Sequence, residues 1–137
     1  MQSKFHLWRL QYYASTNKIY STKIEIDSET SCLALIDGSG ASVIRQFKSR
    51  RDEDKEASTS RAAVLTFYDA LSSGQDLATG GAPQMVGIWR KGPARRFGVI
   101  WKGDRYVAGL KIPNNISQSS HIHWFDDKFK SLGPLSA

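Results

Sequence analysis

The stretch RRFGVIWKGDRYVAGLKI, residues 95–112, decides the fold class, because it has the pattern of a β-hairpin. Large apolar residues recur at every second position on both sides of the Gly103-Asp104 step, which is typical of half-buried strands. Glycine readily adopts the positive φ that a two-residue hairpin turn requires. We therefore predict a turn at Gly103-Asp104, inside a strand meander that begins at Gln84 and is closed by Pro113.

The predicted register determines which side chains meet across this hairpin. A turn at Gly103-Asp104 places Trp101 opposite Tyr106 on a core face. It places Gly98 opposite Gly109 on the other face, together with two pairs of like charges, which disfavour strand pairing by roughly a few tenths of a kcal/mol each. These pairs are Lys102 with Arg105 and Arg96 with Lys111. Two interpretations stay open: an anion-binding patch with a glycine floor, or long side chains that splay into water and protect the sheet from aggregation.

The basic charge of the chain is concentrated in the same segment. The sequence has 19 Lys and Arg against 13 Asp and Glu, a net charge of +6, and the whole excess lies in residues 81–137. Residues 90–111 alone hold seven cations and one anion. We therefore predict that this basic meander binds an acidic macromolecule, of which nucleic acid is the commonest kind. The predicted binding residues are Arg96, Lys102, Arg105 and Lys111.

Two aromatic residues lie near the edge of the predicted patch. Trp89 or Tyr106 would add base stacking to a nucleic-acid interface, but the parity of Tyr106 points it to the core. Residues 96–101 also resemble the aromatic strand of RNA-recognition domains, although they lack the alternating exposed aromatic residues of that motif. We therefore do not assign the chain to that class.

The first part of the chain predicts three further strands. Residues 6–14 and 19–26 alternate with period two, and we expect them to pair. The run 32–36 is apolar at both parities, so we expect a strand that is buried on both faces inside a sheet.

Two segments with helical spacing follow. Apolar residues recur at this spacing from Ala41 to Lys48 and again from Ala62 to Leu71. Ser58, Thr59 or Ser60 supplies an N-cap for the second helix, and Gly74 ends it.

The predicted fold class is α+β, with the order β-β-β-α-α-β-β-β and antiparallel sheet packed against a helix pair. We expect one domain over residues 1–137, frayed at residues 1–5 and 130–137. The single cysteine, Cys32, excludes an internal disulfide. No apolar run is long enough to span a bilayer and no secretory signal opens the chain, so we expect a cytoplasmic protein with no membrane partner.

Two other groups of residues are candidates for an anion site and a metal site. The loop from Asp37 to Ser42 precedes a helix and can offer backbone N–H groups to an anion, but a turn without ligand is the favoured interpretation. His121 and His123 stand near two aspartates, and we interpret them as partly exposed histidines beside an apolar anchor rather than as metal ligands. We predict no catalytic residue, no metal site and no cofactor. The anchor itself, Trp124 and Phe125, is a predicted docking element for a protein partner.

The run Leu35-Ile36-Asp37-Gly38-Ser39-Gly40-Ala41, the helix pair and the meander from Met85 to Leu110 resemble the middle of proteasome-type β subunits, which are N-terminal-nucleophile hydrolases. The likeness covers residues 19–112. That family needs a processed N-terminal Thr, Ser or Cys whose amine acts as the base. This sequence begins Met1-Gln2-Ser3, and no catalytic residue of the family can be assigned to a position in it. The resemblance therefore implies a sheet sandwich flanked by helices, in a trimmed and inactive form.

The sequence thus leaves three functional hypotheses. The first is a small non-enzymatic binding module that uses the basic meander, residues 90–111. The second is a protein like the N-terminal-nucleophile hydrolases that is inactive alone. The third is a structural subunit of an assembly, docked through Trp124 and Phe125.

Overall fold

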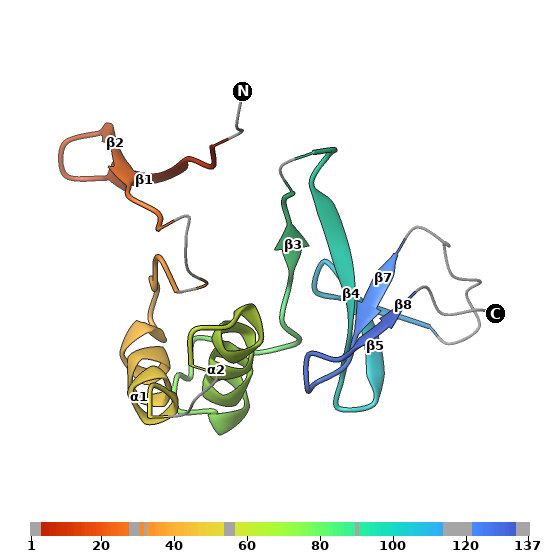
Figure 1. The fold of residues 1–137 in the computed structure, drawn as a ribbon. Helices are drawn as coiled ribbons and strands as arrows, with labels where there is room; N and C mark the ends of the chain where they lie inside the picture. Colours follow the sequence, from red (N-terminus) through yellow and green to blue (C-terminus); the bar gives the residue numbers. More distant parts are fainter. Residues whose placement is uncertain are drawn as a thin grey trace.

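Figure 1 shows the computed structural model of the chain, which describes residues 4–27, 31, 33–53, 57–89, 91–113 and 122–133. It contains an N-terminal hairpin, two helices and a six-stranded sheet, and this α+β architecture with mostly antiparallel strands confirms the predicted class. In chain order the elements are β1 (Leu7–Tyr13), β2 (Lys18–Ile24), α1 (Ala41–Arg51), α2 (Ser60–Ser73), β3 (Val86–Gly87), β4 (Arg95–Trp101), β5 (Asp104–Val107), β6 (Leu110–Ile112), β7 (His123–Phe125) and β8 (Ser131–Gly133).

Strand β4 is the centre of the sheet. It pairs antiparallel with β3 near its start and with β5 near its end, and β5 continues to β6. On its other side β4 pairs in parallel with β7, which pairs antiparallel with β8. The chain end therefore completes the sheet, and Ser131–Gly133 forms a strand where we predicted fraying.

The central hairpin turns one residue earlier than predicted. Lys102 and Gly103 both have positive φ, 52° and 85°, as a type I′ turn requires. The register consequently pairs Trp101 with Asp104 instead of with Tyr106. The partners of β4 shift by two positions, so the side chains of β4 and β5 keep their predicted faces.

The predicted last strand, residues 105–112, is two strands. Ala108 and Gly109 have positive φ, 50° and 79°, and reverse the chain between β5 and β6. The predicted pair Arg96/Lys111 is therefore wrong, because a second turn ends the long strand on which it depended. The predicted pair Lys102/Arg105 is wrong because Lys102 lies in the earlier turn and Arg105 pairs with Ile100.

The predicted buried strand at residues 32–36 is also wrong. Residues 33–36 form no strand, and Leu35 is 38% exposed; Cys32 lies outside the described residues. A strand needs a partner edge, but β1 and β2 pair only with each other, and the large sheet is built from residues 86–133. The apolar run instead leads into α1 as irregular chain.

The two helices follow their sequence signals. The Thr59 hydroxyl accepts the N–H of Ala62 at 3.1 Å and caps α2, and Gly74 ends the helix with a φ of 64°. α2 packs on one face of the sheet through Tyr68, whose ring meets that of Trp101 edge-on with centroids 5.1 Å apart. Tyr68, Val99 and Trp101 form the buried core, which confirms the predicted core face of β4.

We expect the free energy of unfolding to fall by about 1 to 2 kcal/mol between pH 10 and pH 12, because burial, followed by the nearby carboxylates of Asp126 and Asp127, raises the pKa of Tyr68 to about 12. Below pH 10 this tyrosine is protonated in both states and adds no pH dependence. Above pH 10 the unfolded chain releases the proton while the native chain retains it, so stability decreases. Chemical denaturation across this range measures the slope.

The matched variant is Tyr68→Phe, which removes only the hydroxyl that donates to the Met85 sulfur at 3.4 Å. Between pH 10 and pH 12 the free energy of unfolding of this variant should fall by less than that of the native chain. A native ultraviolet titration in which all five tyrosines ionise near pH 10 would contradict the assignment.

Candidate functional site

The structure does not gather the four predicted cations into one patch. Arg96 lies at the start of β4, opposite Val86, whereas Lys102 lies in the turn at the other end, roughly 20 Å away at 3.3 Å per residue. Arg105 shares a face with Arg96, but Lys111 pairs with Tyr106 and lies on the other face.

Lys111 also has a partner of its own. Its Nζ lies 2.7 Å from Asp104 Oδ2, and this hydrogen bond raises the pKa of Lys111. The Asp104 carboxylate therefore competes with any external anion for this cation. The anion-binding role of the four residues stays a prediction, but as separate side chains and not as two cross-strand pairs.

The predicted glycine floor is filled from within the chain. Parallel pairing of β7 with β4 places Trp124 beside Gly98, and a methyl group on Gly98 would lie 2.7 Å from indole Cζ3 and closer still to Cδ2 and Cε3. A methyl group on Gly109 would lie 2.7 Å from the Gln84 side chain. These glycines make room for the chain's own side chains rather than for a ligand.

The same packing corrects the predicted docking element. Trp124 is 1% exposed and Phe125 is half-buried, so the pair is part of the sheet's own packing. The sequence showed an apolar anchor, and the structure shows that its tryptophan anchors the chain end to β4. Trp124 is therefore not exposed for docking, and a protein partner at Trp124 and Phe125 stays a prediction.

The face of the sheet opposite Trp124, which is the same face of β4 that carries Val99 and Trp101, has a row of aromatic rings beside the core that α2 covers. Because β7 runs parallel to β4, Phe125 stands on the same face as Phe97, with ring centroids 5.1 Å apart. Phe129 stacks on Phe125 at 4.6 Å with an interplanar angle of 13°, and Trp89 meets Phe97 edge-on at 5.6 Å. We call Trp89, Phe97, Phe125 and Phe129 the aromatic row. His123 adjoins it, with its ring 5.1 Å from that of Phe125.

The aromatic row is accessible to a ligand. Trp89 is 47% exposed, and the three phenylalanines are half-buried. None of the four belongs to the cluster that α2 covers, which contains Val99, Trp101 and Tyr106. Rings of this size are normally found in a core, so this half-exposed row is a candidate binding surface.

Cations stand at both ends of the row. The Arg95 guanidinium lies over the Trp89 ring, 5.6 Å from its centroid, and exposed Lys91 belongs to the loop between β3 and β4. At the other end, exposed Lys128 and Lys130 flank Phe129. Within the described part of the chain, no salt bridge to an acidic side chain occupies any of these four cations. Their charge is available to an external anion.

The turn that presents Phe129 is held by a carboxylate. Asp126 Oδ1 accepts the backbone N–H groups of Lys128 and Lys130, at 2.9 and 2.7 Å. Phe129 itself has a φ of 52°, a conformation that bulky side chains seldom adopt. The hydrogen bonds to Asp126 fix the turn in a shape that seats this ring on Phe125.

Sequence reasoning found only part of this site. It named Trp89 as a stacking residue, and it placed Tyr106 toward the core, where the structure also has it. It named Phe125 only as part of a protein-docking anchor and did not find Phe129, because no local pattern shows that residues 123–125 pair with β4. Arg90 and His121 of the predicted segments lie outside the described residues.

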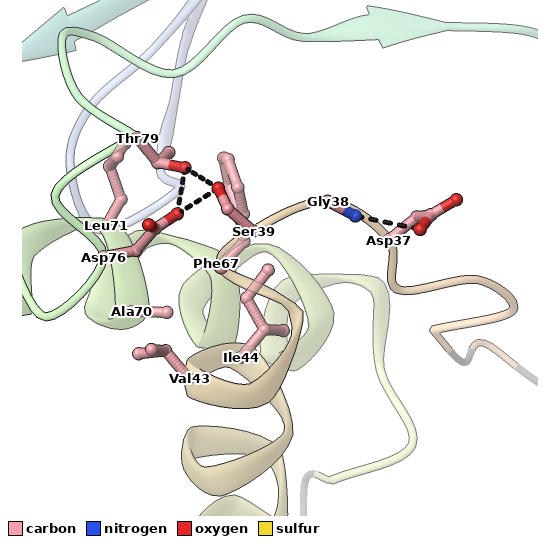
Figure 2. Close-up of a pocket in the computed structure, with 11 residues that line it drawn as sticks. Asp37, Gly38, Ser39, Val43, Ile44, Phe67, Ala70, Leu71, Asp76 and Thr79 are labelled. Carbon is pink, nitrogen blue, oxygen red and sulfur yellow. Dashed lines mark hydrogen bonds between the residues drawn. The ribbon is translucent and has the colours of Figure 1, made fainter. Parts of the chain in front are cut away.

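A cavity of about 150 Å³ opens at the start of α1 (Figure 2). Its polar rim is a cluster in which Ser39 donates to Asp76 Oδ2 at 2.7 Å and Thr79 donates to the same oxygen. The hydrogen bonds from Thr79 and then Ser39 lower the pKa of Asp76. Because this ionised carboxylate sits beside Gly40, it takes the position that an anion would need at the helix N-terminus. The cluster therefore supports the ligand-free interpretation of this loop.

No family model matches the chain, and the comparisons with curated proteins and with solved structures found no match. The resemblance to proteasome-type β subunits thus stays a prediction. Among the described residues, no group of three or more His, Cys, Asp and Glu side chains is placed to hold a metal ion. The helices of the described ranges are also too short and too polar to cross a bilayer. The case for a function therefore rests on the aromatic row and its cations.

Proposed function

We propose that this chain is a non-enzymatic module that binds single-stranded nucleic acid on the aromatic row. The observation that carries the proposal is the juxtaposition of half-exposed rings with cations that have no acidic partner in the described chain. Proteins that bind single strands combine these two features, because rings stack with bases while cations follow the phosphates. Every base has a π-face, so we expect weak dependence on base sequence.

The individual groups have distinct roles in this proposal. Trp89 is the most exposed ring of the row, and it offers the first stacking platform. Arg95 lies against that ring and can reach a phosphate while its guanidinium plane stays near the base. Lys128 and Lys130 contact the phosphates of the nucleic acid at the other end of the aromatic row. Arg96 lies on the other face of β4 and can contact only a strand that bends around the edge.

We expect binding to a short oligothymidine to weaken steeply with salt, because each phosphate contact to a single strand adds about −0.7 to the slope of log affinity against log salt. Arg95→Gln and Lys91→Gln should each weaken binding and reduce the magnitude of that slope by about 0.7. Fluorescence anisotropy across a salt series measures both quantities.

The control is Lys18→Gln, which removes another exposed cation, from the N-terminal hairpin. It should leave the slope unchanged. A second set of variants removes the sequence-predicted cations Arg96, Lys102, Arg105 and Lys111, and should weaken binding less than Arg95→Gln. Absence of binding by the native chain even at low salt would refute the proposal.

A further inference from the structure

The N-terminal hairpin exposes an unusual amount of apolar surface. Seven of the fourteen exposed large hydrophobic side chains of the described chain lie between residues 5 and 20. They are Phe5, Trp8, Leu10, Tyr12, Tyr13, Ile19 and Tyr20. A patch of this kind on a small protein marks an interaction surface.

The hairpin's loop sets the arrangement of these side chains. Tyr13 pairs with Lys18 across a four-residue loop, so Tyr12 faces Ile19 and Leu10 faces Ser21. Since faces alternate along each strand, one face carries four apolar residues that are 56 to 70% exposed. We call this the docking face, made of Trp8, Leu10, Tyr12 and Ile19.

Nothing in the described chain covers the docking face. Its four side chains are 56 to 70% exposed, and the hairpin stands apart from the large sheet in Figure 1. Arg9, on the opposite face, pairs with Asp37 at 2.6 Å and ties the hairpin to the loop before α1. An isolated two-stranded hairpin is marginally stable in water, so this one needs a further packing partner.

We propose that this partner is a second copy of the chain, packed docking face against docking face in a symmetric dimer. Aromatic side chains bury roughly 150 to 250 Å² each, so covering four large side chains that are now half to two-thirds exposed removes about 500 Å² per copy. Two copies thus bury about 1,000 Å², which is the lower limit for a specific interface. We expect a weak dimer with micromolar affinity.

Charge and shape on this face both fit a second copy. Its single charged side chain, Lys23, lies 3.4 Å from Glu25, so two basic chains do not bring free charges together here. The β1 row of large side chains stands beside the small Ser21 of β2. A two-fold axis can place Leu10 of one copy over Ser21 of the other, and the reverse contact then forms by symmetry. With no unpaired cation, the face is unsuited to nucleic acid.

Sedimentation equilibrium from about 1 to about 200 µM tests the proposal, since this range brackets a micromolar dissociation constant. The native chain should change from its monomer mass of 15.3 kDa to twice that value. Leu10→Asp should raise the dissociation constant at least about tenfold, because each copy then buries a carboxylate. Ile19→Thr keeps β-propensity on the same face and should weaken the dimer to a smaller degree.

The matched control is Leu77→Asp, the same change at a leucine that is 97% exposed in the loop after α2. It should dimerise like the native chain. Circular dichroism of each variant verifies that the fold is intact. A native chain that stays monomeric over the whole range overturns the proposal, and so does a folded Leu10→Asp variant that dimerises as well as Leu77→Asp.

Discussion

Replacing Gly98 with alanine is expected to lower the free energy of unfolding by about 3 kcal/mol, at the upper end for overpacking a core. The indole of Trp124 lies directly on the Gly98 backbone, with no room for a methyl group between them. Trp124 is 1% exposed, so surrounding atoms prevent the ring from moving aside. The strain should separate β7 from β4 and loosen the far side of the sheet.

Urea denaturation of three variants tests this packing. Gly80→Ala is the control, because no described atom lies within 4 Å of the added methyl group there, and its stability should stay within about 0.5 kcal/mol of native. Adding Trp124→Leu to Gly98→Ala should cost less than the sum of the two single changes, since the smaller side chain leaves space for the methyl group. Equal costs at Gly98 and Gly80 would show that the indole does not occupy this position.

Removing the Trp89 ring by alanine substitution is expected to weaken single-strand binding about 10- to 100-fold, because one base–aromatic stack contributes about 1 to 3 kcal/mol. Trp89 is 47% exposed and outside the α2 core, so stability should change little. Trp89→Phe retains a ring and should lose only part of the affinity. This result rests on the proposed function, and anisotropy titration with oligothymidine measures it.

The matched control is Trp8→Ala, which removes a tryptophan of similar exposure, 56%, from the N-terminal hairpin. Titrations at nanomolar chain concentration keep the proposed dimer dissociated, so this variant should bind like the native chain. Equal losses of affinity for Trp8→Ala and Trp89→Ala would show that the oligothymidine does not bind specifically at the aromatic row.

Local signals predicted most elements of the fold. The Thr59 cap, the Gly74 stop and the alternation through Val99 and Trp101 each act within a few residues, so they could be found in the sequence. The turn near Gly103 was misplaced by one residue because Lys102 also takes a positive φ, which no composition rule favours. The prediction of a strand at 32–36 was wrong because apolar side chains alone do not provide the neighbouring strand with which it would have to pair.

The sequence by itself determined which side chains share a face of β4, where the charge lies, where α1 begins, and where α2 begins and ends. Only the tertiary structure decided that residues 123–125 join β4 in parallel. That pairing puts Trp124 on Gly98, which closes the predicted glycine floor, and puts Phe125 beside Phe97, which extends the face of Val99 and Trp101 by a half-exposed aromatic row. Strand periodicity is a local property of the backbone, whereas the choice of a distant partner depends on packing across the whole sheet.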